Sequence, residues 1–97
     1  MLKAVNPATG ETVREVALDS EADINAKIEA SLAAFHEWKT KSYAERAKLL
    51  KAVAAHMRKH VETLAPIMTE EMGKPIKEGR GEVEKSAWCA EHYADHA

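Results

Sequence analysis

Cysteine, proline, glycine and aromatic residues are all scarce in this sequence. Its 97 residues include one cysteine, three prolines, four glycines, two tryptophans, two tyrosines and one phenylalanine. A single cysteine cannot form an internal disulfide, which excludes the small disulfide-stapled secreted domains. No apolar run is long enough for a signal peptide or a transmembrane helix. These absences predict a cytoplasmic protein with no membrane association.

An excess of charge of one sign is also missing, because 14 basic residues nearly balance 16 acidic ones. No global field therefore favours nucleic acid, an anionic membrane or a polyanionic substrate. The length allows one small domain and excludes separate cofactor and substrate domains within these residues. The bulky apolar residues number 25, which is few for a core. We expect the isolated chain to be marginally stable and to gain from partner surface.

Residues 2–18 differ from the rest of the chain. Val5, Val13 and Val16 flank the segment Asn6-Pro7-Ala8-Thr9-Gly10. The proline presets a turn and the glycine can adopt a positive φ, so the pattern predicts a β-hairpin. An isolated two-stranded hairpin is barely stable in water, and we expect it to lean on another element.

Residues 20–97 have helical periodicity. Ser20 with Asp23, and Ser42 with Glu45, resemble capping boxes that open helices over about 21–38 and 43–59. The first helix carries one apolar stripe: Ile24, Ile28, Leu32, Phe35 and Trp38. A third helix over about 61–72 ends at Gly73 and Pro75, and a fourth runs from about 75 towards 97. The predicted fold class is mainly α, with a short N-terminal β-hairpin followed by about four amphipathic helices.

Two features of the fourth helix stand out. Gly79 and Gly81 each cost about 1 kcal/mol relative to alanine in a helix interior, so we expect another backbone to approach them closely. The sequence also stops without a helix-ending residue or a polar tail, as a cut segment would.

Residues with catalytic or metal-binding potential do not form a recognisable set. His56 and His60, like His92 and His96, are spaced to share a metal, but a third ligand is missing and we interpret them as surface histidines. Cys89 lacks the partner groups of a reactive thiol, so we expect a buried or half-buried, inert thiol at this position. Basic residues of the second helix are interleaved with glutamate and alanine and favour a solvated face over a nucleic-acid footprint.

Several segments nonetheless form an ordered series. In chain order they are Val5-Asn6-Pro7-Ala8-Thr9-Gly10-Glu11, Ala34-Phe35 through Trp38, Ala44-Glu45-Arg46 with Leu49-Leu50, Glu71-Met72-Gly73-Lys74-Pro75, Gly81-Glu82-Val83, and Tyr93-Ala94. Together they resemble the N-terminus of the NAD(P)-dependent aldehyde dehydrogenase superfamily over essentially the whole chain. The stretch from Gly73 to Glu91 is most similar to succinate-semialdehyde dehydrogenases.

The resemblance implies that residues 1–97 are the N-terminal portion of the dinucleotide-binding domain in a much longer enzyme of α/β fold. Such an enzyme oxidises an aldehyde to a carboxylic acid through a cysteine thiohemiacetal, hydride transfer to NAD or NADP, and thioester hydrolysis. The resemblance places the catalytic and cofactor-binding residues beyond Ala97, so the segment alone is expected to be inert and to bind no cofactor. Cys89 does not match the motif of the nucleophile. Assembly as a homo-oligomer is also expected.

Two sites within the chain follow from the same resemblance. A monovalent cation would lie between the backbone carbonyls of Ala4 and Val5 and the carboxylate of Glu71, with a remaining ligand outside the chain. Contacts with the substrate entrance are expected on one face of the fourth helix: Ser86, Cys89, Ala90 and Tyr93.

Two other functions stay open at this point. The chain could be a stand-alone helical interaction or oligomerisation module that buries its apolar stripes on a partner or a second copy. It could also be a small nucleic-acid-binding domain that uses its second helix.

Overall fold

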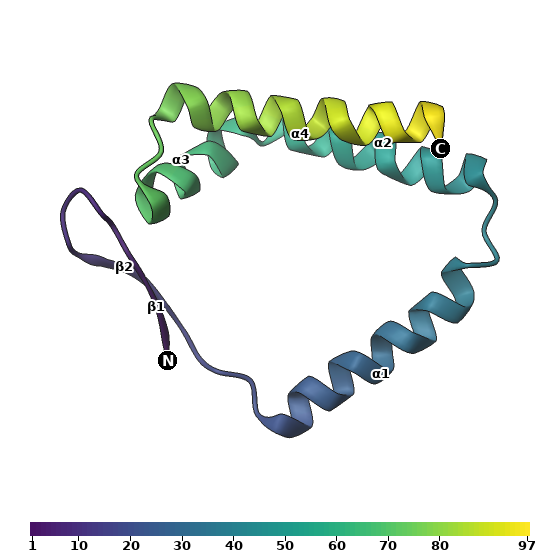
Figure 1. Ribbon diagram of the computed structural model, residues 1–97, viewed down its shortest axis with the longest axis horizontal. Coiled ribbons are helices and arrows are strands. Elements are labelled where there is room, and N and C mark those ends of the chain that lie inside the picture. Colours follow the sequence, from purple (N-terminus) through teal and green to yellow (C-terminus); the bar gives the residue numbers. More distant parts are fainter.

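A two-stranded hairpin and four helices make up the structure, a computed structural model that describes all of residues 1–97 (Figure 1). The elements are β1 (Leu2–Val5), β2 (Thr12–Val16), α1 (Glu21–Trp38), α2 (Tyr43–Lys59), α3 (Val61–Met72) and α4 (Ile76–His96). The predicted class, mainly α after an N-terminal hairpin, is confirmed. The predicted helix bounds agree with the observed ones to within one or two residues, because the capping residues mark them locally.

The hairpin is antiparallel, with Ala4 opposite Arg14 and an irregularity in register between Ala4 and Val5. Its turn follows the local chemistry of the sequence. The side-chain oxygen of Asn6 accepts a hydrogen bond from the Ala8 amide at 2.9 Å, and Gly10 adopts a φ of 77°. Asparagine at the start of the turn and glycine at a positive φ are the residues that such a turn requires.

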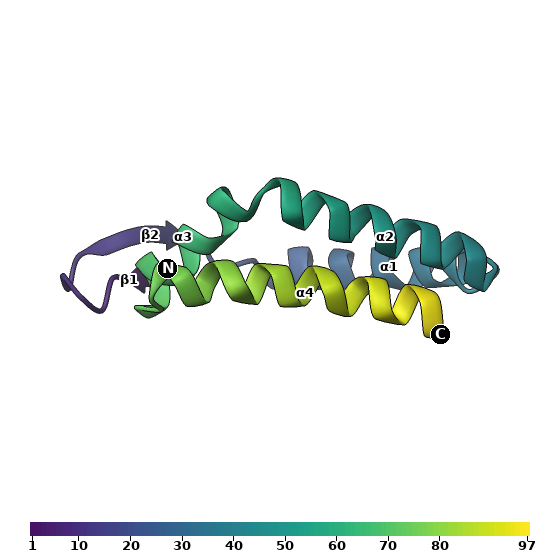
Figure 2. The ribbon, with the colours of Figure 1, turned by 90° about the horizontal axis from the view of Figure 1, so that it is seen from above.

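Helices α2, α3 and α4 form the only packed unit of the chain. α2 and α4 run side by side, and α3 packs at one end of them (Figures 1 and 2). The buried residues of this unit are all small or medium-sized: Ala54, Ala65, Gly79, Val83 and Ala87. Small residues allow two helix backbones to approach closely, so the helices are joined with little bulky core between them.

The expectation for the two glycines of α4 is half right. A β-carbon on Gly79 would lie 3.2 Å from the carbonyl oxygen of Ala65, so α3 does approach this position closely. A β-carbon on Gly81 would meet nothing within 4 Å. The prediction of a close backbone is therefore confirmed at Gly79 and wrong at Gly81, which lies on the open side of the helix.

Helix α1 stands apart from the other helices. It lies across an open ring from α2 and α4 and joins α2 only through the turn after its last residue (Figure 1). None of its residues is buried. The radius of gyration is 17.3 Å, whereas a compact domain of this size has about 13 Å. The apolar stripe of α1 is thus present as predicted but is uncovered within the chain.

Candidate functional site

The turn of the hairpin packs against the end of α3. Gly73 caps α3 in the left-handed conformation, with a φ of 73°. A β-carbon at this position would lie only 2.8 Å from Cγ of Pro7. The Asn6-Pro7 turn and the Gly73-Lys74-Pro75 segment, 66 residues apart in the sequence, therefore meet in space. The hairpin does lean on another element, as its marginal stability requires.

An ion pair crosses the same junction. The guanidinium of Arg14 on β2 donates to Oε1 of Glu71, near the end of α3. Arg14 lies opposite Ala4 in the hairpin register, so this pair joins Glu71 to the strand next to the one that carries Ala4 and Val5. Sequence reasoning missed Arg14. The only signal was its place in the hairpin, because nothing local links it to a residue 57 positions away.

The oxygen atoms at this junction would supply some of the ligands that a hard monovalent cation needs. Oε1 of Glu71 is engaged by Arg14, while Oε2 accepts no hydrogen bond from the protein. Carboxylate and carbonyl oxygens are the ligands that hard cations prefer. Arg14 already supplies a positive charge to the carboxylate, so a bound cation would share Glu71 with it. The cation site at Ala4, Val5 and Glu71 stays a prediction.

The four residues expected at the substrate entrance lie on one side of α4 but border different hollows. Ser86 lines a groove of about 320 Å³ between α2, α3 and α4, whose walls include Met57, Ile67 and Val83. Cys89 and Tyr93 line a separate hollow of about 210 Å³ on α4. Cys89 is exposed, so the expectation of a buried or half-buried thiol is wrong. Ala90 is half-buried and borders neither.

Ion pairs tie α2 to α4. Nε of Arg58 donates to Oε1 of Glu84 at 2.6 Å, and the same guanidinium forms a bidentate ion pair with the carboxylate of Glu91. Nζ of Lys51 lies 2.7 Å from Oδ1 of Asp95. The hydrogen bonds from Arg58 lower the pKa of Glu91, and the bond from Lys51 lowers the pKa of Asp95. The same pairing raises the pKa of Arg58. These groups lie at the surface, where an ion pair adds little to stability.

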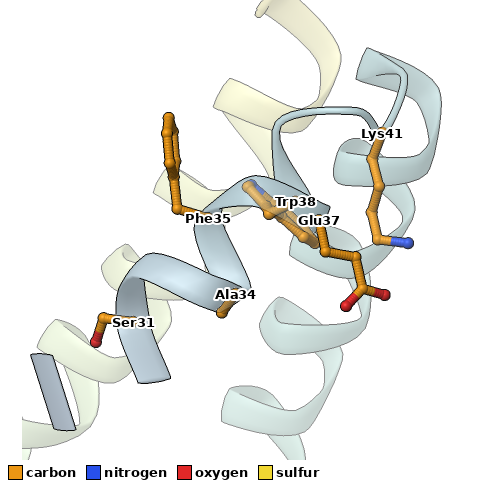
Figure 3. Close-up of a pocket in the computed structure, with 6 residues that line it drawn as sticks. All are labelled: Ser31, Ala34, Phe35, Glu37, Trp38 and Lys41. Atoms are coloured by element: carbon orange, nitrogen blue, oxygen red, sulfur yellow. The ribbon is translucent and has the colours of Figure 1, made fainter. Parts of the chain in front are cut away.

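Two further hollows lie around the end of α1. One, of about 490 Å³, is lined by residues of α1 and the turn after it: Ser31, Ala34, Phe35, Glu37, Trp38 and Lys41 (Figure 3). The other, of about 300 Å³, lies between that turn and the ends of α2 and α4, and Trp38 borders it as well. There Nη2 of Arg46 donates to the Lys39 carbonyl at 3.1 Å, and the guanidinium lies 5.5 Å from the Tyr43 ring centroid.

The histidine pairs remain pairs in the structure. The ring centroids of His56 and His60 are 4.2 Å apart, and those of His92 and His96 are 4.4 Å apart. No group of three or more His, Cys, Asp or Glu side chains comes together in a way that could hold a metal ion. None of the four helices combines the length and the apolar character that a membrane span requires.

Comparison with known proteins assigns the family. The profile of the aldehyde dehydrogenase family matches residues 1–97. Malonate-semialdehyde dehydrogenase 2 of Shouchella clausii (strain KSM-K16) is 38% identical over 86 residues, covering 89% of this chain and 18% of the relative. The NAD(P)+ succinate semialdehyde dehydrogenase Sad of Escherichia coli (strain K12) is 36% identical over 93 residues, covering 96% and 20%. Mitochondrial succinate-semialdehyde dehydrogenase of Arabidopsis thaliana is 38% identical over 96 residues, covering 99% and 18%. The chain thus spans about a fifth of the length of these relatives, and it belongs to the aldehyde dehydrogenase family.

Proposed function

We propose that residues 1–97 form the N-terminal portion of the dinucleotide-binding domain in an NAD(P)-dependent aldehyde dehydrogenase. The observation that carries this proposal is the family match along the whole chain. The contact between the Asn6-Pro7 turn and Gly73 supports it, because two of the segments that resemble the family pack against one another. The reaction would be oxidation of an aldehyde to its carboxylic acid.

The proposed substrate is a short aldehyde that carries a carboxylate at its other end, such as succinate semialdehyde. The relatives named above support this class, since they act on malonate semialdehyde or succinate semialdehyde by their names. The contribution of this chain would be to shape the substrate entrance through the α4 residues Ser86, Cys89, Ala90 and Tyr93. The hollow with Cys89 and Tyr93 also contains Lys85, whose ammonium group would suit a carboxylate.

The residues of this chain do not fit a dinucleotide. A phosphate-binding loop needs glycines at a turn from a strand into a helix, where backbone N–H groups point at the phosphates. Here Gly73 ends α3 and packs on Pro7, while Gly79 packs inside α4 against Ala65. NAD or NADP would therefore be held by residues outside 1–97, as would the nucleophile and the general base, and these residues alone would be inert.

The proposal also covers a monovalent cation site, the cellular compartment of the enzyme and its assembly. Glu71 Oε2 and the carbonyls of Ala4 and Val5 would contribute to a monovalent cation site completed by a ligand from outside the chain. The near balance of charges and the single cysteine support a cytoplasmic enzyme without nucleic-acid or membrane partners. Large apolar side chains left at the surface support assembly into a homo-oligomer.

A chimeric enzyme tests the proposal. Residues 1–97 replace the matching segment of Escherichia coli Sad, and reduction of NAD and NADP is followed with succinate semialdehyde as substrate. We expect activity from the chimera, and none from the 97-residue chain alone or from Sad without that segment. A chimera that folds and stays inactive with semialdehydes, beside active Sad, would contradict the proposal. Sequencing the transcript beyond codon 97 is a second check, because an immediate stop codon would leave no place for the catalytic residues.

A further inference from the structure

Arg14 on β2 is the basic residue that contacts the Glu71 carboxylate. Lys74, three residues after Glu71, pairs with Glu82 instead. The exposed fractions of the two side chains are 47% for Arg14 and 29% for Glu71, so water and salt screen this ion pair only in part. Within residues 1–97 the negative charge of Glu71 is therefore balanced by a guanidinium.

The ladder of the hairpin is interrupted beside this ion pair. Ala4 lies opposite Arg14. The next residue, Val5, lies opposite Thr12, so Val13 is left without a partner. A bulge of this kind disrupts the ladder locally. The irregular backbone thus falls at the two residues whose carbonyls would bind a cation, on a strand that α3 contacts.

The charges at this junction decide how strongly a cation could bind there. The Glu71 carboxylate and two backbone carbonyls together carry a net charge of −1, whereas the same oxygens with the Arg14 guanidinium attached are neutral. In sites built from oxygen ligands, cation affinity depends on how many of the ligands are charged. Two positive charges that share one carboxylate also repel each other. The contact with Arg14 therefore opposes cation binding.

We propose that Arg14 is a built-in competitor of the monovalent cation, and that by holding Oε1 of Glu71 its guanidinium lowers the affinity of the site formed by Ala4, Val5 and Glu71. This inference rests on the cation site of the proposed function. Guanidinium and cation would each tie the hairpin to α3 through the same carboxylate. Removal of the guanidinium should therefore tighten cation binding about tenfold and make attachment of the hairpin depend on the cation.

The test uses the full-length chimera in which residues 1–97 replace the matching segment of Escherichia coli Sad. Its Tm is followed by circular dichroism in KCl, NaCl and choline chloride at constant ionic strength. The rise in Tm with cation concentration gives the dissociation constant and requires no enzymatic activity. Arg14→Gln should lower the dissociation constant for K⁺ or Na⁺ about tenfold. Arg14→Lys keeps the charge and should bind the cation as the wild type does.

Lys3 provides the matched control. Its Nζ lies 2.9 Å from Oε1 of Glu15, which is the pair next to Ala4 and Arg14 in the ladder. Because side chains alternate along a strand, Lys3 points to the opposite face of the hairpin from Arg14. Lys3→Gln removes the same charge from the hairpin and should leave the dissociation constant unchanged.

Four results would overturn the proposal. They are unchanged or weaker cation binding in Arg14→Gln, equal tightening in Lys3→Gln or Arg14→Lys, a Tm response that persists in Glu71→Gln, and no specific response to K⁺ or Na⁺ in any variant. Hydrogen exchange of the hairpin amides is a further check. It should be faster in Arg14→Gln and slow again on addition of K⁺ or Na⁺, and exchange that stays fast would count against the proposal. Failure of the proposed function is seen separately, as a folded chimera that does not oxidise semialdehydes.

Discussion

Gly79 and Gly81 provide a matched pair for testing how α3 and α4 pack. They lie two residues apart in the same helix, and both have ordinary helical backbones, since neither has a positive φ. Only Gly79 faces another element. We therefore expect Gly81→Ala to stabilise the protein and Gly79→Ala to destabilise it, although the chemical change is identical.

The expected magnitudes follow from the two environments. Alanine is favoured over glycine in a helix interior by about 1 kcal/mol. At Gly81 the added methyl group meets nothing within 4 Å, so the free energy of unfolding should rise by about 0.5–1 kcal/mol. At Gly79 the methyl group would lie 3.2 Å from the Ala65 carbonyl oxygen and 3.5 Å from the Ala65 β-carbon. Overpacking of this kind costs about 1–3 kcal/mol, which exceeds the helical gain and leaves a net loss of about 1 kcal/mol.

The assay is urea and thermal unfolding of both variants and the wild type by circular dichroism. The two variants should differ by about 2 kcal/mol, or roughly 8–16 °C in Tm for a domain of this size. Unchanged m-values would show that both changes act on the folded state. If Gly79→Ala stabilises the protein as much as Gly81→Ala, α3 does not contact α4 at this position and the account of the core is wrong.

Three other outcomes follow from local contacts. Gly73→Ala should lower the free energy of unfolding by about 1–2 kcal/mol, because alanine is strained in the left-handed conformation of this residue. It should also raise the hydrogen-exchange rates of the hairpin amides, because the added methyl group would displace Pro7. Gly10→Ala is the control for the backbone cost alone, since Gly10 has a φ of 77° and open space around it. Ser42→Ala should cost about 1 kcal/mol in urea unfolding, whereas Ser20→Ala should only lower protection of α1 amides from hydrogen exchange, since α1 packs on no other helix. Pairing with Arg58 lowers the pKa of Glu91 in the folded protein, so the ion pair stabilises the fold above the ordinary pKa of 4.5, and this stabilisation is lost as the pH falls below it. In Glu91→Gln, the urea midpoint of unfolding should therefore fall less between neutral and acidic pH than it does in the wild type.

The sequence predicted the elements well, because their signals are local. Ser20 and Ser42 each bond to a residue three positions on, and both capping boxes form as expected. Gly73 ends α3 in the left-handed conformation that the Gly-Lys-Pro segment predicts. Such patterns depend on neighbours within one helical turn, so they do not require knowledge of the fold.

The candidate sites were harder to predict, because they depend on how distant segments meet. The pairing of Arg14 with Glu71 joins residues 57 positions apart and has no local signature. The residues Ser86, Cys89 and Tyr93 share one side of α4, yet a helix side about 100° wide can border several grooves, and here it borders three. Gly81 looked like Gly79 in sequence and differs only in which side of α4 it occupies.

The small size of the core does not come from a shortage of large apolar residues. Of the 25 large apolar side chains, 17 are exposed: Met1, Leu2, Val5, Val13, Val16, Leu18, Ile24, Ile28, Leu32, Phe35, Trp38, Tyr43, Leu49, Val53, Met72, Trp88 and Tyr93. The core is small because α2, α3 and α4 meet through alanine, glycine and valine, not because large apolar residues are few. Close helix contact through small residues leaves the large side chains free for other surfaces. The exposure of large apolar side chains within residues 1–97 therefore follows from where they lie, and α1 alone carries five of them in one stripe.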